Sequence, residues 1–291
     1  MTFEEAYNKG KDILTKANIA DASIDARLLL EEVAHVNNAY LLAHANEELK
    51  LSCEDKIEDK YFQMIETRAK RIPLQHIVGY QDFMSLRFKV NSDVLVPRFD
   101  TEILVEEALK HVHDGMRVLD MCTGSGCILI SVLNYSNDCT GVGADISDKA
   151  LAVAGENADT LLSQRSDVSF SFIQSDLFSN LSRKDRFDVI VSNPPYIQTK
   201  VIDTLESEVK DHDPFIALDG GDDGLCFYRR IISEAGDYLN PGGVILFEIG
   251  YDEAEAVTTL LTDAGFINVE VVKDLSGLDR VVVGYKSCLT N

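Results

Sequence analysis

Four residues that follow a short apolar run can hold a planar nitrogen group. The run FDVIVS is typical of a β-strand, and Asn193-Pro194-Pro195-Tyr196 follows it directly. The two prolines fix φ and remove backbone donors, so the loop is stiff and presents carbonyl acceptors. The Asn193 side-chain oxygen and the Pro194 carbonyl can accept from both hydrogens of a conjugated –NH₂ group, while Tyr196 covers its flat face. The loop therefore predicts a site for a planar amide or exocyclic amine, and a proline turn without a ligand is the alternative.

A second group of residues is typical of a nucleoside site. The segment VLDMCTGSGCILI reads as a strand, a turn over residues 122–126 and the start of a helix, with Gly124 and Gly126 in the turn. The free N–H groups at the start of that helix favour a negatively charged ligand group. Asp145 ends the next apolar run, 21 residues beyond Gly124, where a carboxylate accepts hydrogen bonds from ribose hydroxyls.

The glycine pattern separates two nucleoside cofactors. A dinucleotide fingerprint reads G-x-G-x-x-G, and the third glycine is missing here, which weakens an NAD interpretation. The form D-x-x-T-G-S-G suits S-adenosylmethionine, whose methionine carboxylate would lie over the turn. The predicted contacts in the turn are Cys122, Thr123, Gly124, Ser125 and Gly126. A tight strand-to-helix turn without a ligand is the alternative.

The segment QSDLF ends a further strand at the same edge of the predicted sheet. Asp176 could accept a hydrogen bond from an adenine amino group, and Leu177 could cover the ring. An equally open interpretation is that Asp176 caps the N-terminus of a helix.

The spacing of apolar residues predicts an α/β protein with a helical N-terminal part. From Thr2 to about Arg71 the spacing is helical, and Pro73 ends the last helix. HIVGYQDFMSLRFKVN alternates like a β-hairpin. Short strands then alternate with helices, which predicts a mostly parallel, doubly wound sheet whose last two of seven strands form an antiparallel edge hairpin. We expect a helical substrate-recognition domain over 1–75, a β-hairpin linker over 76–93 and a Rossmann-like domain over 94–291.

Composition narrows the possible partners. With 27 basic and 49 acidic residues the net charge is −22, which disfavours a nucleic-acid partner. The six cysteines form no C-x-x-C pair and lie near no histidine cluster, so we expect no metal site and no disulfide framework. The N-terminus lacks the pattern of a signal peptide and no long apolar run occurs, so we expect a cytoplasmic protein without a membrane partner. We also expect a monomer.

Beyond these motifs, the sequence closely resembles the protein-(glutamine-N5) methyltransferases that modify peptide chain release factors, the PrmC/HemK family. The resemblance covers nearly the whole chain and includes DARLLLEEV, RIPLQHIVGYQDF, VLVPRFDTE, DMCTGSGC, QSDLF, NPPY, DPFIALDGGDDGLCFYRRI, FEIG and GLDRVVVG. It implies a class I methyltransferase sheet and transfer of a methyl group to the glutamine of a Gly-Gly-Gln motif, in support of translation termination. It also implies that residues 122–126, Asp145, Leu177 and Asn193 contact S-adenosylmethionine, while residues 193–196 hold the glutamine.

Other functions share part of this pattern. A sister family methylates a glutamine of a ribosomal protein, but Phe99-Asp100-Thr101-Glu102 after VPR favours release factors. Asp100 and Thr101 also suit the N-terminal cap of the helix that follows. An adenine-N6 methyltransferase would use the same NPPY loop on nucleic acid, which the charge disfavours. An NAD oxidoreductase and a ligand-sensing module without turnover are further alternatives, and binding of S-adenosylmethionine against NAD separates them.

Overall fold

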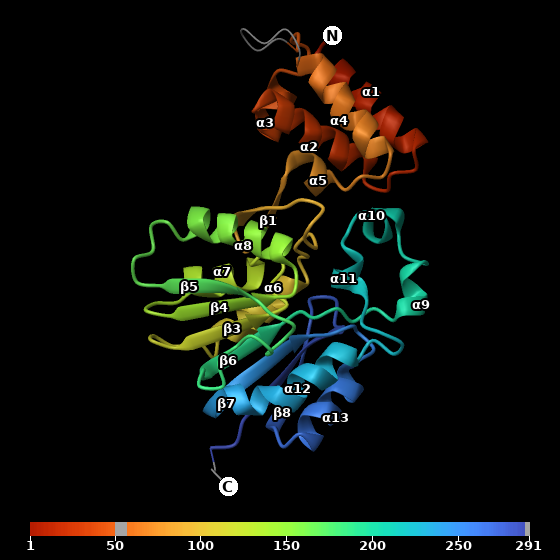
Figure 1. Ribbon diagram of the computed structural model, residues 1–291. Helices are drawn as coiled ribbons and strands as arrows, with labels where there is room; N and C mark the ends of the chain where they lie inside the picture. The colour runs from red at the N-terminus through yellow and green to blue at the C-terminus, as the bar shows by residue number, and fades with distance from the viewer. Residues whose placement is uncertain (50–56, 289–291) are drawn as a thin grey trace. The chain divides into compact units, whose positions relative to one another are not determined.

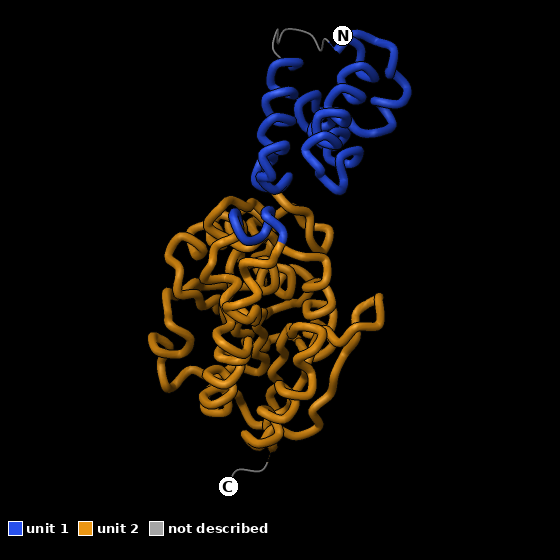
Figure 2. Tube along the Cα trace, turned by 90° about the vertical axis from the view of Figure 1, so that its right-hand side faces the viewer, with its two compact units in different colours: residues 1–79, 206–212 blue, residues 80–205, 213–291 orange. Residues whose placement is uncertain are grey.

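The computed structural model describes residues 1–49 and 57–288. The chain divides into two compact units. Unit 1 comprises residues 1–79 and 206–212, and unit 2 comprises residues 80–205 and 213–291 (Figure 2). The chain leaves unit 2 after the NPPY loop and returns to it, so unit 1 is discontinuous in sequence.

Unit 1 is a helical bundle, as its apolar spacing predicts. Its helices are α1 (Phe3–Lys16), α2 (Ala22–Ala34), α3 (Asn38–Ala43), α4 (Ile57–Ala69), α5 (Leu74–Val78) and α10 (Ser207–Lys210). Helix α1 begins with a capping box in which the Thr2 hydroxyl accepts from the Glu5 N–H and the Glu5 carboxylate accepts from the Thr2 N–H. Leu14, Leu29 and Tyr61 are fully buried between α1, α2 and α4, and this apolar packing holds the bundle together.

An ion-pair network holds the returning segment within unit 1. The buried Arg68 Nε donates to Asp25 Oδ2 at 2.7 Å. Arg68 Nη1 and Arg71 Nη1 lie 3.3 Å and 3.2 Å from the Glu208 carboxylate. Because Glu208 belongs to residues 206–212, these arginines join that segment to α4 and the turn after it.

Unit 2 begins with a two-stranded antiparallel hairpin, β1 (Tyr80–Phe83) and β2 (Leu86–Lys89). The turn residues Met84 and Ser85 both have positive φ, 48° and 58°, as a type I′ turn requires. The alternating pattern predicts a hairpin from residue 76, but residues 74–78 form α5 instead. Gly79 ends that helix with a φ of 84°, so its left-handed conformation separates helix from strand.

The rest of unit 2 is a seven-stranded sheet of order β5-β4-β3-β6-β7-β9-β8. Its strands are β3 (Arg117–Met121), β4 (Thr140–Asp145), β5 (Ser169–Gln174), β6 (Phe187–Ser192), β7 (Leu239–Glu248), β8 (Ile267–Lys273) and β9 (Asp279–Tyr285). Strands β3 to β7 pair in parallel, whereas β9 pairs antiparallel with β7 and β8. The predicted α/β fold with an antiparallel edge hairpin is confirmed.

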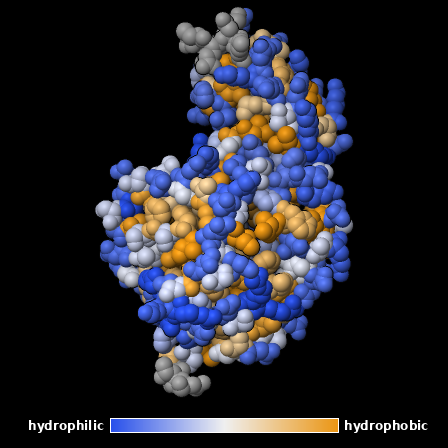
Figure 3. Space-filling model, in the orientation of Figure 1, coloured by the Kyte–Doolittle hydropathy of each residue, from blue (hydrophilic) through white to orange (hydrophobic). Residues whose placement is uncertain are grey.

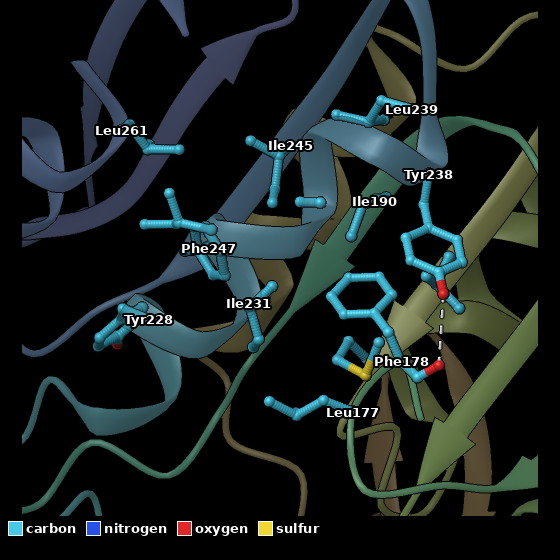
Figure 4. Packing of buried hydrophobic residues seen from close by; sticks show 14 of the residues in the cluster. Leu177, Phe178, Ile190, Tyr228, Ile231, Tyr238, Leu239, Ile245, Phe247 and Leu261 are labelled. Atoms are coloured by element: carbon cyan, nitrogen blue, oxygen red, sulfur yellow. Dashed lines mark hydrogen bonds between the residues drawn. The ribbon is translucent and has the colours of Figure 1, made fainter. Parts of the chain in front are cut away.

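Helices cover both faces of this sheet (Figure 1). Val189 and Val191 of β6 pack in one apolar cluster with α6 (Thr101–Leu109), α7 (Cys127–Tyr135) and α8 (Asp148–Leu161). Ile190, between them, packs in the other cluster with α12 (Cys226–Tyr238) and α13 (Ala254–Asp263). The strand period of two divides these apolar residues between the two layers. In the second cluster Phe178 stacks on Tyr238 at 4.6 Å between ring centroids (Figure 4).

Two short helices, α9 (Thr199–Ile202) and α11 (Phe215–Leu218), lie in the segments that follow the NPPY loop. No helix in residues 1–49 and 57–288 has the length and apolar character needed to cross a membrane.

Candidate active site

The predicted site residues meet at the carboxyl edge of the parallel strands. The register pairs Met121 with Ala144 and with Ser192, and it pairs Asp145 with Gln174, so β3, β4, β5 and β6 end side by side. A cavity lies at this edge. Of the predicted residues, its lining includes Cys122, Thr123, Gly124, Ser125, Asp145, Asp176, Leu177, Asn193 and Pro195. Gly126, Pro194 and Tyr196 are not among the lining residues. Such an edge, where neighbouring strands run to loops on opposite sides, is the usual ligand site of an open α/β sheet.

Asp145 is held by backbone donors of the two adjoining turns. Its Oδ2 accepts from the Gly124 N–H at 2.9 Å, and its Oδ1 accepts from the Ser147 N–H at 2.9 Å. Burial raises the pKa of Asp145, and these two backbone hydrogen bonds oppose the rise. The carboxyl group is therefore fixed in orientation at the wall of the cavity, with its remaining lone pairs available for a ligand.

The turn over residues 122–126 depends on a close helix contact and a buried carboxyl group. Gly126 has a φ of 79°, and a Cβ there would lie 3.1 Å from Ala154 Cβ of α8, so a larger residue would strain the turn and push α7 away from α8. Asp120 Oδ2 accepts from the Thr123 hydroxyl at 2.6 Å, and burial raises the pKa of Asp120 to about 7. The hydrogen bond from Thr123 to Asp120 therefore anchors the turn, and the D-x-x-T spacing is the sequence signal for that role.

The QSDLF segment combines a surface ion pair with a buried side chain. Asp176 Oδ1 accepts from Arg230 Nη2 at 2.7 Å, and both residues line the cavity. A turn without a helix follows Asp176, so the alternative that it caps a helix is wrong. Leu177 has a φ of 52° and is 4% exposed, and it packs beside Phe178 in the core while also lining the cavity (Figure 4).

Asn193 lies at the end of β6 and faces the start of α6. Its Nδ2 is 3.4 Å from the Thr101 hydroxyl oxygen. The prediction that Asp100 and Thr101 cap this helix is wrong in its side-chain detail, because Asp100 occupies the N-cap position without making a cap hydrogen bond. Asp100 instead pairs with Arg280 at 3.3 Å, and the buried Thr101 faces Asn193. Tertiary partners have displaced the local cap.

The loop containing DPFIALDGGDDGL forms hydrogen bonds with the residues that follow the NPPY motif. The Ile197 N–H donates to the Leu218 carbonyl at 3.0 Å, and the Gly220 N–H donates to the Ile197 carbonyl at 2.8 Å. The Thr199 hydroxyl donates to Asp219 Oδ1 at 2.6 Å. Pro214, Ile216 and Ala217 of the same loop line the cavity. The loop therefore contributes to the cavity wall.

Gly220 shows how tightly the two loops pack. A Cβ there would lie 2.7 Å from both Cα and the carbonyl carbon of Tyr196, which are backbone atoms. We expect Gly220→Ala to displace the NPPY loop and to lower kcat roughly tenfold, because sub-ångström errors in a catalytic loop are costly. Steady-state methyl transfer measures this effect.

Gly155→Ala in α8 is the matched control, because nothing lies within 4 Å of the added Cβ. It should leave kcat unchanged and stabilise the fold by about 0.5–1 kcal/mol. Wild-type kcat in Gly220→Ala would show that the loop contact does not position the site.

No group of three or more His, Cys, Asp and Glu side chains suited to a metal ion occurs within residues 1–49 and 57–288. Cys122, Cys127, Cys139, Cys226 and Cys288 are free thiols, and Cys53 lies outside the described residues.

The sheet order, the glycine-containing turn and the acidic residue at the end of β4 define a class I methyltransferase. Residues 96–209 match the family model described as "Methyltransferase small domain", and residues 5–79 match "PrmC N-terminal domain". The crystal structure of a methyltransferase from Pyrococcus furiosus shares the fold, with a TM-score of 0.52 and 19% identity over 69% of this chain and 89% of that one.

Full-length relatives define the family. The release factor glutamine methyltransferase of Caulobacter vibrioides is 44% identical over 99% of this chain and 98% of its own length. The protein of the same name from Clostridium botulinum is 39% identical over 98% of this chain and 100% of its own length. The chain therefore belongs to the release factor glutamine methyltransferase family.

Proposed function

We propose that this protein transfers a methyl group from S-adenosylmethionine to the side-chain amide nitrogen, N5, of the glutamine in the Gly-Gly-Gln motif of class 1 peptide chain release factors. The observation that carries the proposal is the cavity in which Asp145, the turn over residues 122–126 and Asn193 meet. Family membership over nearly the full chain supports the same reaction and the same substrate class.

The residues at the cavity fit S-adenosylmethionine. Asp145 offers a fixed carboxylate for ribose hydroxyls. The turn before α7 lines the cavity at the start of that helix, where the helix dipole favours the methionine carboxylate, while the Thr123, Gly124 and Gly126 N–H groups are paired within the protein. Ile146 and Leu177 supply apolar surface for an adenine ring, with Asp176 beside them as an acceptor for its amino group. When bound, this cofactor supplies a methyl group activated by its sulfonium charge.

The NPPY loop then has to orient a poor nucleophile. The lone pair of an amide nitrogen is delocalised, so the nitrogen attacks only if its geometry is held and its growing positive charge is stabilised. The Asn193 side-chain oxygen and the Pro194 carbonyl accept from the two amide hydrogens, Pro195 limits the loop's freedom, and Tyr196 lies against the planar group. Burial raises the pKa of Tyr196, so its phenol stays neutral in this role.

The partner is a protein loop that must reach the cavity. Apolar side chains stand exposed on the loops beside it, with Phe99 69% exposed and Phe215 and Ile216 half exposed. Figure 3 shows apolar residues gathered in the region of α11. We assign contact with the substrate loop to this surface and recognition of the rest of the release factor to the helices of unit 1. The chain acts as a cytoplasmic monomer without nucleic acid or membrane in this proposal.

Mass spectrometry tests the proposed reaction. After incubation of an intact class 1 release factor with this protein and S-adenosylmethionine, we expect a gain of one methyl group, located by fragmentation on the glutamine of Gly-Gly-Gln. A release factor with that glutamine replaced by alanine is the control. A DNA duplex containing adenine and the glutamine-containing ribosomal protein, offered separately, test the competing substrates. Methylation of either one in place of the release factor would contradict the proposal.

A further inference from the structure

A buried glutamate of β7 lies next to Asn193. In the parallel pairing of β6 with β7, Ser192 is opposite Phe247, so the residues that follow each of them, Asn193 and Glu248, are neighbours at the strand ends. Glu248 is 2% exposed, and its Oε2 is buried without a hydrogen-bond partner. A carboxyl group removed from water is costly unless it has a use or a partner, so this position calls for an explanation.

The contacts of Glu248 point toward the NPPY loop. Asn193 Nδ2 is 3.4 Å from the Thr101 hydroxyl oxygen, and both side chains lie close enough to the Glu248 carboxyl group to lower its pKa. An asparagine amide can present either its oxygen or its –NH₂ to a ligand, and only the oxygen can accept from a substrate amide. A carboxylate behind Asn193 accepts only, so it selects the orientation in which –NH₂ points inward and Oδ1 points into the cavity.

A neighbouring positive charge stabilises the buried Glu248 carboxylate. Arg280 of β9 is 9% exposed and attracts Glu248, while its guanidinium pairs with Asp274 at 3.0 Å and with Asp100 at 3.3 Å. The titratable and charged groups that face Glu248 from the elements around it are Asp100, Cys127, Tyr196, Tyr228 and Arg280.

We propose that Glu248 is a positioning residue for methyl transfer: its carboxylate holds the Asn193 amide so that the side-chain oxygen faces the reacting nitrogen. This inference rests on the proposed function for its catalytic consequence. The contact itself, between Glu248 and Asn193, can be tested without turnover.

The proposed role of Glu248 predicts that kcat depends on pH. Burial raises the pKa of Glu248 to about 7, and the Thr101 and Asn193 side chains oppose that rise. As pH falls through this range, the carboxylate gains a proton and can itself donate a hydrogen bond. It then no longer selects the orientation of the Asn193 amide. We therefore expect wild-type kcat to decline below about pH 7 and Glu248→Gln to lack this limb, because glutamine does not titrate there. Glu248→Gln should also lower kcat roughly tenfold at pH 8.

An exchange of the two groups is the sharper test. Asn193→Asp places two carboxyl groups in contact, which should lower kcat by on the order of 10²-fold or more. The double variant Asn193→Asp with Glu248→Gln again has one amide and one carboxylate, with their positions exchanged. The amide at position 248 then donates to the carboxylate at position 193, and that carboxylate accepts from the substrate amide. We expect the double variant to exceed Asn193→Asp roughly tenfold, although Glu248→Gln alone is harmful. If Glu248 has only a structural role, the kcat losses of Asn193→Asp and Glu248→Gln should multiply in the double variant.

The control is Glu107→Gln, which removes a buried carboxylate of α6 that pairs with Lys110 and His111 away from the cavity. It should keep the wild-type pH profile and kcat. Nuclear magnetic resonance supplies the readout without turnover: the Asn193 side-chain amide signals should shift with pH near 7 in the wild type and not in Glu248→Gln. Signals that do not titrate, or multiplicative losses in the double variant, overturn the role of Glu248. Titrating signals in a protein that methylates no release factor overturn the proposed function alone.

Discussion

Asn193→Ala is expected to lower kcat by on the order of 10²- to 10³-fold while leaving S-adenosylmethionine affinity within a few-fold of the wild type. The loss of one preorganised acceptor has this magnitude when charge develops on the bound atom in the transition state. The fold should be unaffected, because Asn193 is half-buried and its neighbours Pro194 and Pro195 stiffen the loop. Single-turnover methyl transfer and calorimetric titration of the cofactor separate the two effects.

Thr199→Ala is the matched control for Asn193→Ala. Thr199 is the first residue of α9, six residues after Asn193, and it is not part of the cavity lining. The substitution removes only its hydrogen bond to Asp219. Its kcat should fall far less than that of Asn193→Ala. Near-wild-type turnover in Asn193→Ala would show that another group holds the reacting amide.

Asp145→Ala should weaken S-adenosylmethionine binding by about 1–3 kcal/mol, which is the scale of hydrogen bonds to a charged group. Part of this loss comes from the ribose contacts and part from the turn, because Asp145 also accepts from Gly124 and Ser147. Asp145→Asn keeps one acceptor oxygen and should lie between Asp145→Ala and the wild type. Calorimetry measures the dissociation constants, and the kcat of the saturated enzyme should change much less.

Asp148→Ala controls for the loss of a nearby carboxylate, since Asp148 is exposed in the first turn of α8. Its cofactor affinity should match the wild type. Unchanged affinity in a folded Asp145→Ala protein would refute the ribose assignment.

Local sequence patterns suffice to predict the class of fold and the strand ends at which the predicted site residues lie. Apolar runs of strand length alternating with helical segments predict a doubly wound sheet, and the structure confirms it with its antiparallel edge. The turn at Gly124, Asp145 and Asn193 each directly follow or end an apolar strand, and parallel strands bring such ends to one edge. The fold prediction is confirmed because it depends on local periodicity, and the meeting of these strand ends follows from a general property of parallel sheets.

The side chains that support the predicted site are set by long-range packing, which the sequence patterns do not reveal. Asp100 has the local pattern of a helix cap, but Arg280, far along the chain, pairs with it instead. The contact of Gly220 with the Tyr196 backbone and the place of Glu248 beside Asn193 depend on strand order and loop packing between distant segments. The assignment of residues 206–212 to unit 1 likewise depends on ion pairs with Arg68 and Arg71. Such contacts leave no periodic signal in the chain, because their energy comes from partners that only folding brings together.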